Sequence, residues 1–451
     1  MSLQFKKVLV ALFAIAFTMA AIAVGWIEKE RANPEKAARF HADEVTRACI
    51  NCHDEKHAAV DFSRQWEKSV HASKGIGCMS CHQAKEGDKD LWVHEGYDVA
   101  MVPSPRDCES CHEEQFDQFT NSHHAKAAEF IGSLDNMLGE VVEGGPAANL
   151  GCKQCHGSVV QVDDKGVPLP GSWPNTGIGR INPDGSIGTC TACHTRHHFS
   201  KAQAREPITC GRCHMGPDHP QIEIFEESKH GIMFVAHRDK MNLDADEWVV
   251  GKDYTAAPTC ATCHMAATPT QKSTHDIGAR ISWTLRPVIS KRLENWEVKR
   301  DSMTKVCLEC HGKTWTANYF RMFDDAVGLY NDKFATPANG IMETLKAEGK
   351  ITPTPFDEKL EWTFYELWHH EGRRARMGAS MMGPDFTQWH GFYEVAKHFY
   401  NDFLPQAEQA MPGVTKGALA MPEHAWKHGM SKEEIQKMLD FYEQRYQQEG
   451  E

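Results

Sequence analysis

Sixteen cysteines stand in one short motif that the chain contains eight times, and each copy has the form Cys-x-x-Cys-His. Two thiols three residues apart lie on one helical turn, where they can form thioethers with the two vinyl groups of a haem. The histidine that follows then lies under the iron as its proximal ligand. The motifs predict eight covalently bound c-type haems, attached through Cys49 and Cys52, Cys78 and Cys81, Cys108 and Cys111, Cys152 and Cys155, Cys190 and Cys193, Cys210 and Cys213, Cys260 and Cys263, and Cys307 and Cys310. The predicted proximal ligands are His53, His82, His112, His156, His194, His214, His264 and His311.

Zinc is the alternative that paired cysteines raise, because two Cys-x-x-Cys pairs can build a four-cysteine zinc site. Such a site does not require a histidine directly after each second cysteine. Here the histidine is present in all eight motifs, and none of the 16 cysteines is left over. The pattern therefore favours haem attachment over zinc sites or disulfides.

An acidic residue and a histidine follow the two motifs that lie closest together. These motifs begin at Cys190 and Cys210, and Asp218-His219 comes shortly after the second of them. A carboxylate beside an imidazole suits a pair that moves protons to a bound small molecule near neutral pH. The other interpretation is that Asp218 only orients a His219 that itself binds iron. The residues alone leave both open.

Further histidines are candidates for the second axial ligand of each iron. Of 26 histidines, eight are used as proximal ligands, so eighteen remain. Polar stretches between the motifs supply the candidates His71, His94, His123 or His124, His197 or His198, His230 and His275, with His57 and His41 as further possibilities. The later histidines are interpreted as surface or packed helix residues, namely His369, His370, His390, His398, His424 and His428.

Composition and the N-terminus restrict the class and the compartment. The formal net charge of −13 argues against a nucleic-acid partner and suits a basic redox partner or a soluble surface. Lys6 and Lys7 precede an uncharged stretch from Val8 to Ile27, which suggests a signal peptide or an uncleaved membrane anchor. The positive flank stays in the cytoplasm, so we expect the rest of the chain outside it, in the periplasm or on the outer face of the inner membrane.

The elements that must position the motifs are predicted to be mainly α-helical. We expect a signal or anchor at residues 1–27, a linker at 28–48, and a haem domain of short helices and loops at 49–320. Residues 321–451 are predicted to form a bundle of long helices, because apolar residues recur there in steps of three and four. One such stripe is expected to stop at Pro405, and Ser431 with Glu434 predicts a capping box. Ser158 to Val162 is predicted to form a short strand.

The chain resembles the hydroxylamine oxidoreductase-like octahaem cytochromes over nearly its whole length after the N-terminal segment. The resemblance rests on the eight motifs, on CHTRHHFS at residues 193–200, on CH-x-x-x-DH at 213–219, on SKHG at 228–231, and on Tyr319. It implies seven haems with two histidine ligands each and a catalytic, five-coordinate haem on Cys152, Cys155 and His156. It also implies a trimer formed through the C-terminal helices.

The same resemblance implies roles for particular residues. Asp218, His219 and Tyr319 would line the catalytic pocket. The distal ligands would be His71, His94, His123, His197, His230 and His275.

One departure from the family pattern bears on the direction of the reaction. Members that oxidise hydroxylamine carry a tyrosine from the neighbouring subunit, cross-linked to the catalytic haem. The segment aligned with it, residues 383–391, has Phe386 there, and Tyr393 lies seven residues further on. A phenyl ring has no hydroxyl and no comparable route to the cross-link.

The function predicted first is therefore reduction of nitrite, nitric oxide or hydroxylamine towards ammonium. Oxidation of hydroxylamine or hydrazine is the second prediction. An electron conduit without catalysis is the third, and reduction of sulfur oxyanions such as tetrathionate is the last. By analogy, the redox partner is expected to be a membrane quinol-oxidising or soluble cytochrome.

A basic run in the C-terminal region leaves two interpretations. Arg373, Arg374 and Arg376 could contact haem propionates or an anionic substrate, or they could form a solvated helix face. Met377, Met381 and Met382 beside them are interpreted as packing residues.

Overall fold

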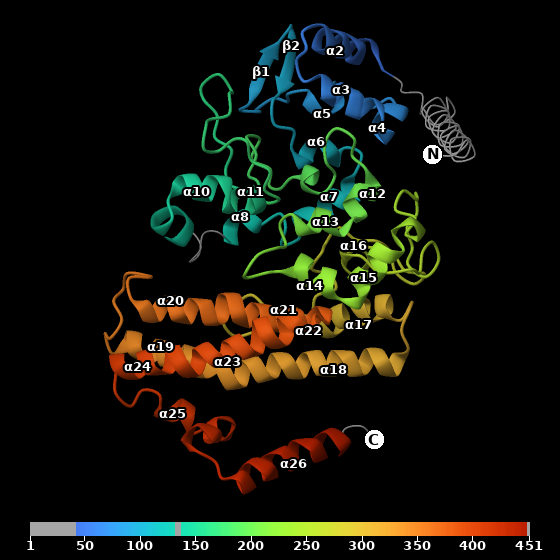
Figure 1. Cartoon of the computed structure of the whole chain (residues 1–451). Helices are drawn as coiled ribbons and strands as arrows, with labels where there is room; N and C mark the ends of the chain where they lie inside the picture. The colour runs from blue at the N-terminus through green and yellow to red at the C-terminus, as the bar shows by residue number, and fades with distance from the viewer. Residues whose placement is uncertain (1–41, 131–136, 449–451) are drawn as a thin grey trace, which may run out of the picture.

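The computed structural model describes residues 42–130 and 137–448. The predicted segment 1–27, most of the linker and the candidate ligand His41 lie outside the described residues. Within them, the fold is mainly α-helical, as predicted, with short helices and loops first and long helices afterwards (Figure 1). No helix in this part of the chain is both long and apolar enough to cross a bilayer.

The motif-bearing region is built from short helices joined by irregular segments. α11 (Cys152–His156) and α16 (Cys260–His264) consist of one motif each, which confirms that the two thiols share a helical turn. The other helices of this region are α2 (Glu44–Glu55), α3 (Val60–Glu67), α4 (Val70–Ser73), α5 (Met79–His82), α6 (Pro105–Glu109), α7 (Glu113–Thr120), α8 (Ala127–Phe130), η1 (Met137–Val142), α10 (Gly145–Leu150), η2 (Cys190–Ala192), α12 (Lys201–Arg205), α13 (Pro207–Gly211), α14 (Gln221–Glu227), α15 (Lys229–Ala236), η3 (Arg238–Lys240) and α17 (Trp296–Cys307).

Strands are few, and they are not where the sequence predicted one. β1 (Leu91–His94) pairs antiparallel with β2 (Tyr97–Ala100), and β3 (Trp283–Thr284) pairs with β4 (Lys291–Arg292). The predicted strand Ser158–Val162 is wrong, because that segment makes only isolated bridges, such as Val162 with Pro168. Proline has no N–H to donate, so a continuous ladder cannot form there.

The C-terminal region is a layer of long helices beneath the motif-bearing region (Figure 1). Its elements are α18 (Lys313–Tyr330), η4 (Asn331–Ala335), α19 (Thr336–Ala347), α20 (Lys359–Tyr365), η5 (Glu366–Glu371), α21 (Gly372–Met381), α22 (Pro384–Thr387), η6 (Gln388–Tyr393), α23 (Glu394–His398), η7 (Phe399–Phe403), α24 (Leu404–Ala410), α25 (Lys416–Leu419), η8 (Pro422–His428) and α26 (Lys432–Gln448). The expected boundary near residue 320 falls inside α18, so this helix belongs to both regions.

Two helix-end predictions have different outcomes. Ser431 and Glu434 form the predicted capping box at the start of α26, with each side chain accepting from the other's backbone N–H. Pro405 does not stop its helix, because α24 continues to Ala410. The preceding residues form the π turn η7, so Pro405 stands at the start of a new helical segment, where its missing N–H costs nothing.

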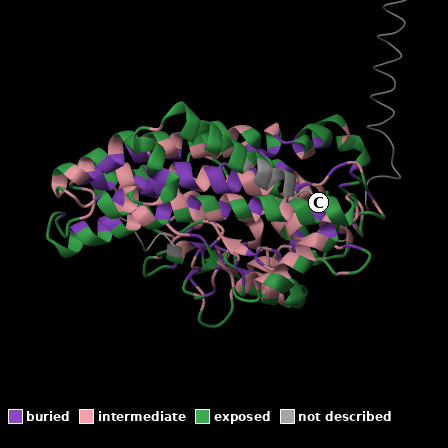
Figure 2. Ribbon diagram, turned by 90° about the horizontal axis from the view of Figure 1, so that it is seen from below, coloured by how far each residue is buried: buried purple, intermediate pink, exposed green. Residues whose placement is uncertain are grey.

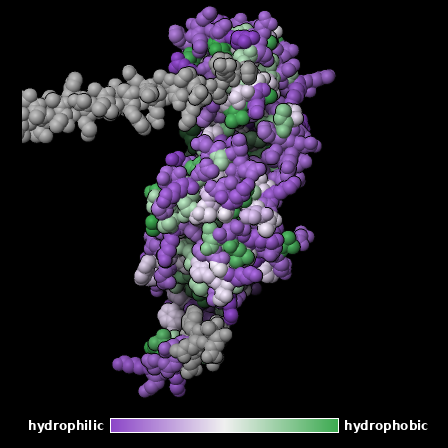
Figure 3. All heavy atoms as spheres, turned by 90° about the vertical axis from the view of Figure 1, so that its right-hand side faces the viewer, coloured by the Kyte–Doolittle hydropathy of each residue, from purple (hydrophilic) through white to green (hydrophobic). Residues whose placement is uncertain are grey.

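The core of the helical layer is made by the predicted apolar stripes. Tyr330, Leu367, Phe399 and Phe403 have no exposed surface and belong to one cluster. Figure 2 shows the buried residues gathered along the inner faces of these helices. The side of the molecule seen in Figure 3 is largely hydrophilic, with scattered hydrophobic side chains.

Truncating this core should destabilise the protein measurably. Leu367→Ala is expected to lower the free energy of unfolding by about 2–5 kcal/mol, because it leaves a cavity in a closely packed cluster. Leu329→Ala is the matched control, since that leucine is 47% exposed on α18. Denaturant unfolding of the haem-loaded protein, followed by far-UV circular dichroism, measures both. Equal losses for the two variants would contradict the assignment of this core.

Candidate functional site

The eight attachment motifs lie side by side in an order that differs from their order in the sequence. Cysteines of the first and second motifs lie next to one another, as do those of the third and fifth, the fourth and sixth, and the sixth and seventh. Electrostatic contacts connect the second with the third, the fifth with the sixth, and the seventh with the eighth. The motifs thus form one continuous series, in which the fourth lies beside the sixth as a branch.

Pairs of histidine rings face each other across gaps of one size. With metal–nitrogen bonds of about 2 Å, two imidazoles on opposite faces of one iron have ring centres about 6 Å apart. Each pair joins a motif histidine to a candidate distal ligand: His53 and His94 at 6.2 Å, His82 and His197 at 6.3 Å, His112 and His71 at 6.3 Å, His214 and His124 at 5.9 Å, and His311 and His230 at 6.1 Å. These residues therefore fit haems held by two histidines.

The other candidates are placed less directly. After burial, His275 makes the largest electrostatic contribution to the lowered pKa of His194, the fifth predicted proximal histidine. The ring centre of His124 lies 5.9 Å from that of His214, and the ring centre of His219 lies 6.1 Å from it, so both histidines adjoin the sixth motif. His123 lies against Gly278. His57 is exposed in the turn after α2.

Burial keeps these imidazoles in the form that binds iron. Desolvation lowers the pKa of His124 and of His197 to about 4, and that of His214 to about 3, with smaller contributions from neighbouring positive groups. An imidazole with so low a pKa is neutral at physiological pH. Only the neutral form offers a lone pair to a metal.

The fourth motif is held by close backbone packing. His156 shares a hydrogen bond of 3.3 Å between Nδ1 and the carbonyl oxygen of Ala127, which leaves Nε2 for iron. Gly157 follows with φ at +88°, and a Cβ there would lie 2.4 Å from the nitrogen of Arg180. Only glycine therefore permits the turn that ends α11.

Asp218 and His219 form a tight pair next to the fourth and sixth motifs. His219 shares a hydrogen bond of 2.5 Å between its Nδ1 and Oδ1 of Asp218. Nε2 of His219 makes no hydrogen bond to the described residues, so this nitrogen can act on a ligand. His219 is one of the groups that lower the pKa of Cys213, and this cysteine lies next to Cys155 of the fourth motif. The pair thus lies where these two motifs meet.

The C-terminal layer contributes two residues to this pair. Arg373 on α21 donates from Nη1 to Oδ2 of Asp218 at 3.0 Å. His369 on η5 places Nε2 at 4.0 Å from the same oxygen. Burial alone would raise the pKa of Asp218, but His219, His369 and Arg373 together hold it well below its usual value. Asp218 is therefore ionised at neutral pH.

The sequence interpretation missed both contributors. His369 was interpreted as a packed or surface histidine, and a solvated helix face was one interpretation of Arg373. Their proximity to Asp218, about 150 residues earlier, arises because α14 packs on α21. The adjacent basic and histidine residues between 369 and 376 were the one available signal, and it did not indicate a partner.

The same helices also cover the fourth motif. Tyr365 and Trp368 pack on Leu138 in one buried cluster. The next residue, Gly139, lies close enough to Cys152 that a Cβ there would be 3.5 Å from its sulfur. Asp218, His369 and the fourth motif therefore share one neighbourhood between the two regions of the fold.

Tyr319 and Phe386, the two other predicted site residues, make their contacts with residues other than Asp218 and His219. The hydroxyl of Tyr319 donates to the carbonyl of Ser380, further along α21 than Arg373, and its ring stacks on Trp315. Phe386 is half-buried on α22, with its ring centre 5.7 Å from that of His390. Their predicted roles remain predictions.

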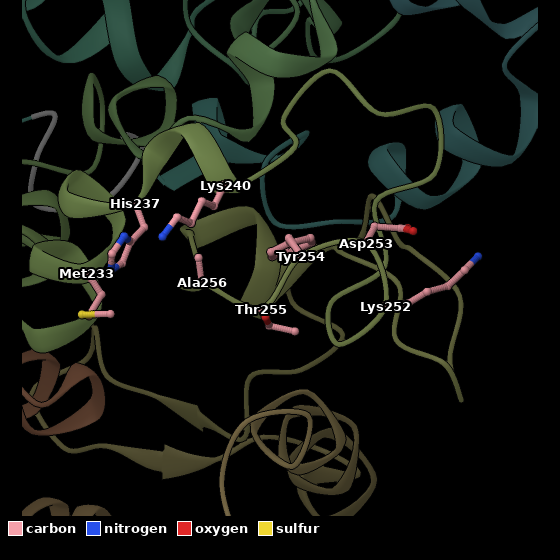
Figure 4. Close-up of a pocket in the computed structure, with 8 residues that line it drawn as sticks. All are labelled: Met233, His237, Lys240, Lys252, Asp253, Tyr254, Thr255 and Ala256. Carbon is pink, nitrogen blue, oxygen red and sulfur yellow. The ribbon is translucent and has the colours of Figure 1, made fainter.

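A cavity of about 530 Å³ opens beside the last motifs (Figure 4). Tyr254 lines it and lies near Cys263 and Cys310 of the seventh and eighth motifs. Lys240 and Lys252 extend on either side of Tyr254. The ammonium group of Lys252 pairs with Glu247 at 3.1 Å.

Comparisons with known proteins agree with the motifs and the fold. Residues 185–355 match the family described as "Seven times multi-haem cytochrome CxxCH". Residues 17–83 and 107–167 match "Cytochrome c554 and c-prime". A "Probable nitrite reductase-hydroxylamine oxidoreductase fusion protein" of Kuenenia stuttgartiensis is 25% identical over 361 residues, which are 68% of this chain. This chain spans only 38% of that relative's length.

Solved structures support the same fold. A "Hypothetical multiheme protein" superposes with a TM-score of 0.71 at 23% identity, covering 83% of this chain and 96% of the other. A reducing HAO-like protein complex of Kuenenia stuttgartiensis superposes with a TM-score of 0.61 at 20% identity, covering 81% of this chain and 85% of the other. The motifs and the family matches indicate a multihaem c-type cytochrome, and its fold is similar to that of a hydroxylamine oxidoreductase-like protein.

Proposed function

We propose that this protein binds eight c-type haems and reduces nitrite, nitric oxide or hydroxylamine towards ammonium at the haem of Cys152, Cys155 and His156. The observation that supports this most is the Asp218–His219 pair, which lies where the fourth and sixth motifs adjoin, with the ring centre of His219 6.1 Å from that of His214. A histidine with a free Nε2 and an ionised carboxylate on Nδ1 can act as a proton donor. An electron conduit has no need of it.

The reaction consumes protons as well as electrons. Hydroxylamine, two electrons and three protons give ammonium and water, and nitrite requires six electrons and eight protons to give ammonium and two waters. When bound, the haem of the fourth motif supplies the electrons and the site for the substrate nitrogen. His219 donates a proton from Nε2 to the substrate oxygen, and Asp218 holds the imidazole in position through Nδ1.

We also propose the ligands of the other haems. The facing rings support pairs of His53 with His94, His82 with His197, His112 with His71, His214 with His124, and His311 with His230. His194 would pair with His275, and His123 would be the second ligand of the haem on His264. The proposed catalytic haem is then the one in which substrate takes the second position.

The reductive direction is proposed because Phe386 stands where oxidising relatives are expected to have their cross-linked tyrosine. The alternative is oxidation of hydroxylamine or hydrazine, and Tyr393, which is 51% exposed on η6, keeps it worth testing. Mass spectrometry of the haem peptide containing His156 separates the two. A peptide cross-linked to a tyrosine would overturn the reductive proposal.

Purified protein should therefore reduce nitrite or hydroxylamine with a reduced viologen dye much faster than it oxidises hydroxylamine with an electron acceptor. The same assay with tetrathionate tests the sulfur oxyanion alternative. Faster oxidation would reverse the proposed direction. If all irons were low-spin and no spectrum changed on adding nitrite or hydroxylamine, the protein would be an electron conduit.

Location and assembly complete the proposal. We infer an extracytoplasmic protein, exported by or anchored through residues 8–27, with a membrane quinol-oxidising or soluble cytochrome as its electron donor. A homotrimer is proposed because α26, which extends away from the helical layer (Figure 1), exposes Ile435 and Leu439. Apolar side chains at these exposures suit a subunit contact.

A further inference from the structure

We propose that His369, Tyr365 and the His370–Glu366 pair form a proton route from the surface to the Asp218–His219 pair. The inference rests on the proposed function, because that function requires a steady supply of protons at His219. Each proton that His219 gives to the substrate must be replaced before the next bond is broken. The route assigns that task to four residues of the C-terminal layer.

The inner half of the route is a buried imidazole between a carboxylate and a phenol. Nε2 of His369 lies 4.0 Å from Oδ2 of Asp218 and 3.1 Å from the hydroxyl oxygen of Tyr365. The side chain of His369 is 7% exposed, and its ring stacks on that of Tyr365 at 4.2 Å. The ring of Trp368 packs edge-to-face against the imidazole, with the ring centres 5.0 Å apart. The low exposure of His369 keeps its proton from passing directly to solvent, and the route crosses the 4.0 Å between Nε2 and Asp218 through a water molecule or a small shift of the ring.

The outer half reaches the surface one helical turn away. Nδ1 of His370 lies 2.6 Å from Oε2 of Glu366, whose side chain is 50% exposed. The hydrogen bond from His370 is the main reason that the pKa of Glu366 lies below its usual value. The ring centre of His370 is 5.2 Å from that of His369 and 5.6 Å from that of Tyr365. These ring contacts bring His370 next to His369 and Tyr365, and the route takes the remaining step between them through a water molecule at the ring edges.

The π turn η5 brings these residues together. Glu366 and His370 are four residues apart, as are Tyr365 and His369, whereas Tyr365 and His370 are five apart. A turn with i to i+5 geometry places both histidines beside one tyrosine, and π turns are frequent at functional sites. An uninterrupted α-helix would rotate His370 away from Tyr365.

The charges around His369 favour transfer towards the site. Asp218 faces it from the segment before α14, and Arg373 faces that carboxylate from α21. His370 and Glu366 face it from η5. Arg373 and His219 keep Asp218 ionised, so the carboxylate attracts an incoming proton without retaining it. The alternative is a purely structural role, in which His369 only packs Tyr365 and Trp368 against Leu138.

His369→Gln tests the route, because glutamine can keep a hydrogen bond but cannot pass a proton as imidazole does. His424→Gln is the matched control: His424 is also buried in the C-terminal layer and shares a hydrogen bond with a tyrosine, Tyr400, at 2.7 Å. In dye-driven hydroxylamine reduction, His369→Gln is expected to lower kcat about 10–100-fold with KM unchanged. The solvent deuterium isotope effect should rise, and added imidazole should restore part of the rate.

A merely structural role predicts another pattern. Equal losses in both variants, or a loss in His369→Gln without any change in isotope effect or rescue, would overturn the route. An unchanged kcat in His369→Gln would overturn it as well.

A second readout separates this inference from the proposed function. Reduction of the haem-loaded protein without substrate should be accompanied by proton uptake, measured with a pH indicator in weakly buffered solution. The uptake is expected to be slower in His369→Gln than in the wild type or His424→Gln. If the wild type reduces no nitrogen compound but shows this difference, the proposed function fails and the route stands. If the uptake rates are the same, the route fails whatever the substrate is.

Discussion

Serine in place of Cys152 and Cys155 is expected to reduce the haem content by one and to abolish nitrite and hydroxylamine reduction. Without the two thioethers the haem of the fourth motif is not retained, and the Asp218–His219 pair has no bound substrate to act on. The expected loss reaches the uncatalysed rate, at least about 10⁶-fold. Intact mass, the pyridine haemochrome spectrum and dye-driven turnover together measure the result.

The matched control removes a different haem. Serine in place of Cys49 and Cys52 also reduces the haem content by one, but the first motif stands at the end of the series and does not adjoin the fourth. Small dyes can still deliver electrons to the remaining motifs, so turnover should persist. If both double variants lost activity equally, or if the fourth-motif variant retained it, the catalytic haem would have been placed wrongly.

His219→Gln has the second-largest expected effect. It removes the proton donor but can keep the hydrogen bond to Asp218, so kcat should fall by about 10²–10⁴-fold with a smaller change in KM. The spectra of the haems with two histidine ligands should not change. His428→Gln serves as the control, because His428 is exposed and distant in sequence. A variant with normal kcat would show that His219 is not the donor.

Asp218→Asn should have a different signature. The native carboxylate is ionised because His219, His369 and Arg373 hold its pKa low despite burial. Asparagine removes that negative charge, so protonation of the neighbouring imidazole becomes harder and turnover should peak at a lower pH. The pH profile of kcat measures this shift. An unchanged profile would mean that the charge of Asp218 does not influence the donor.

Local signals in the sequence were sufficient for the cofactor class. A haem needs two thiols and a histidine within five residues, so Cys260 to His264 specifies its attachment without help from the rest of the fold. The helical character of the C-terminal region was equally readable, because its apolar period depends on neighbours three and four residues away. The strand predicted at Ser158 and the stop predicted at Pro405 failed where local preference met a proline or a π turn.

Contacts between residues far apart in the sequence could not be predicted from local signals. His123 and His124 are adjacent and chemically identical, and only the packing of the sixth motif brings the ring centre of His124 to 5.9 Å from that of His214. Likewise, nothing local distinguishes His369 from other helix histidines. Its distance to Asp218 depends on how α21 lies against α14.

By itself, the sequence determined how many haem attachment motifs this protein has and which histidine follows each, because both are encoded within single helical turns. Only the tertiary structure decided which histidines face one another, how the motifs adjoin, and that Arg373 and His369 belong to the Asp218–His219 pair. The physical reason is range: attachment depends on bonds between near neighbours, whereas a site is assembled by packing between segments about 150 residues apart.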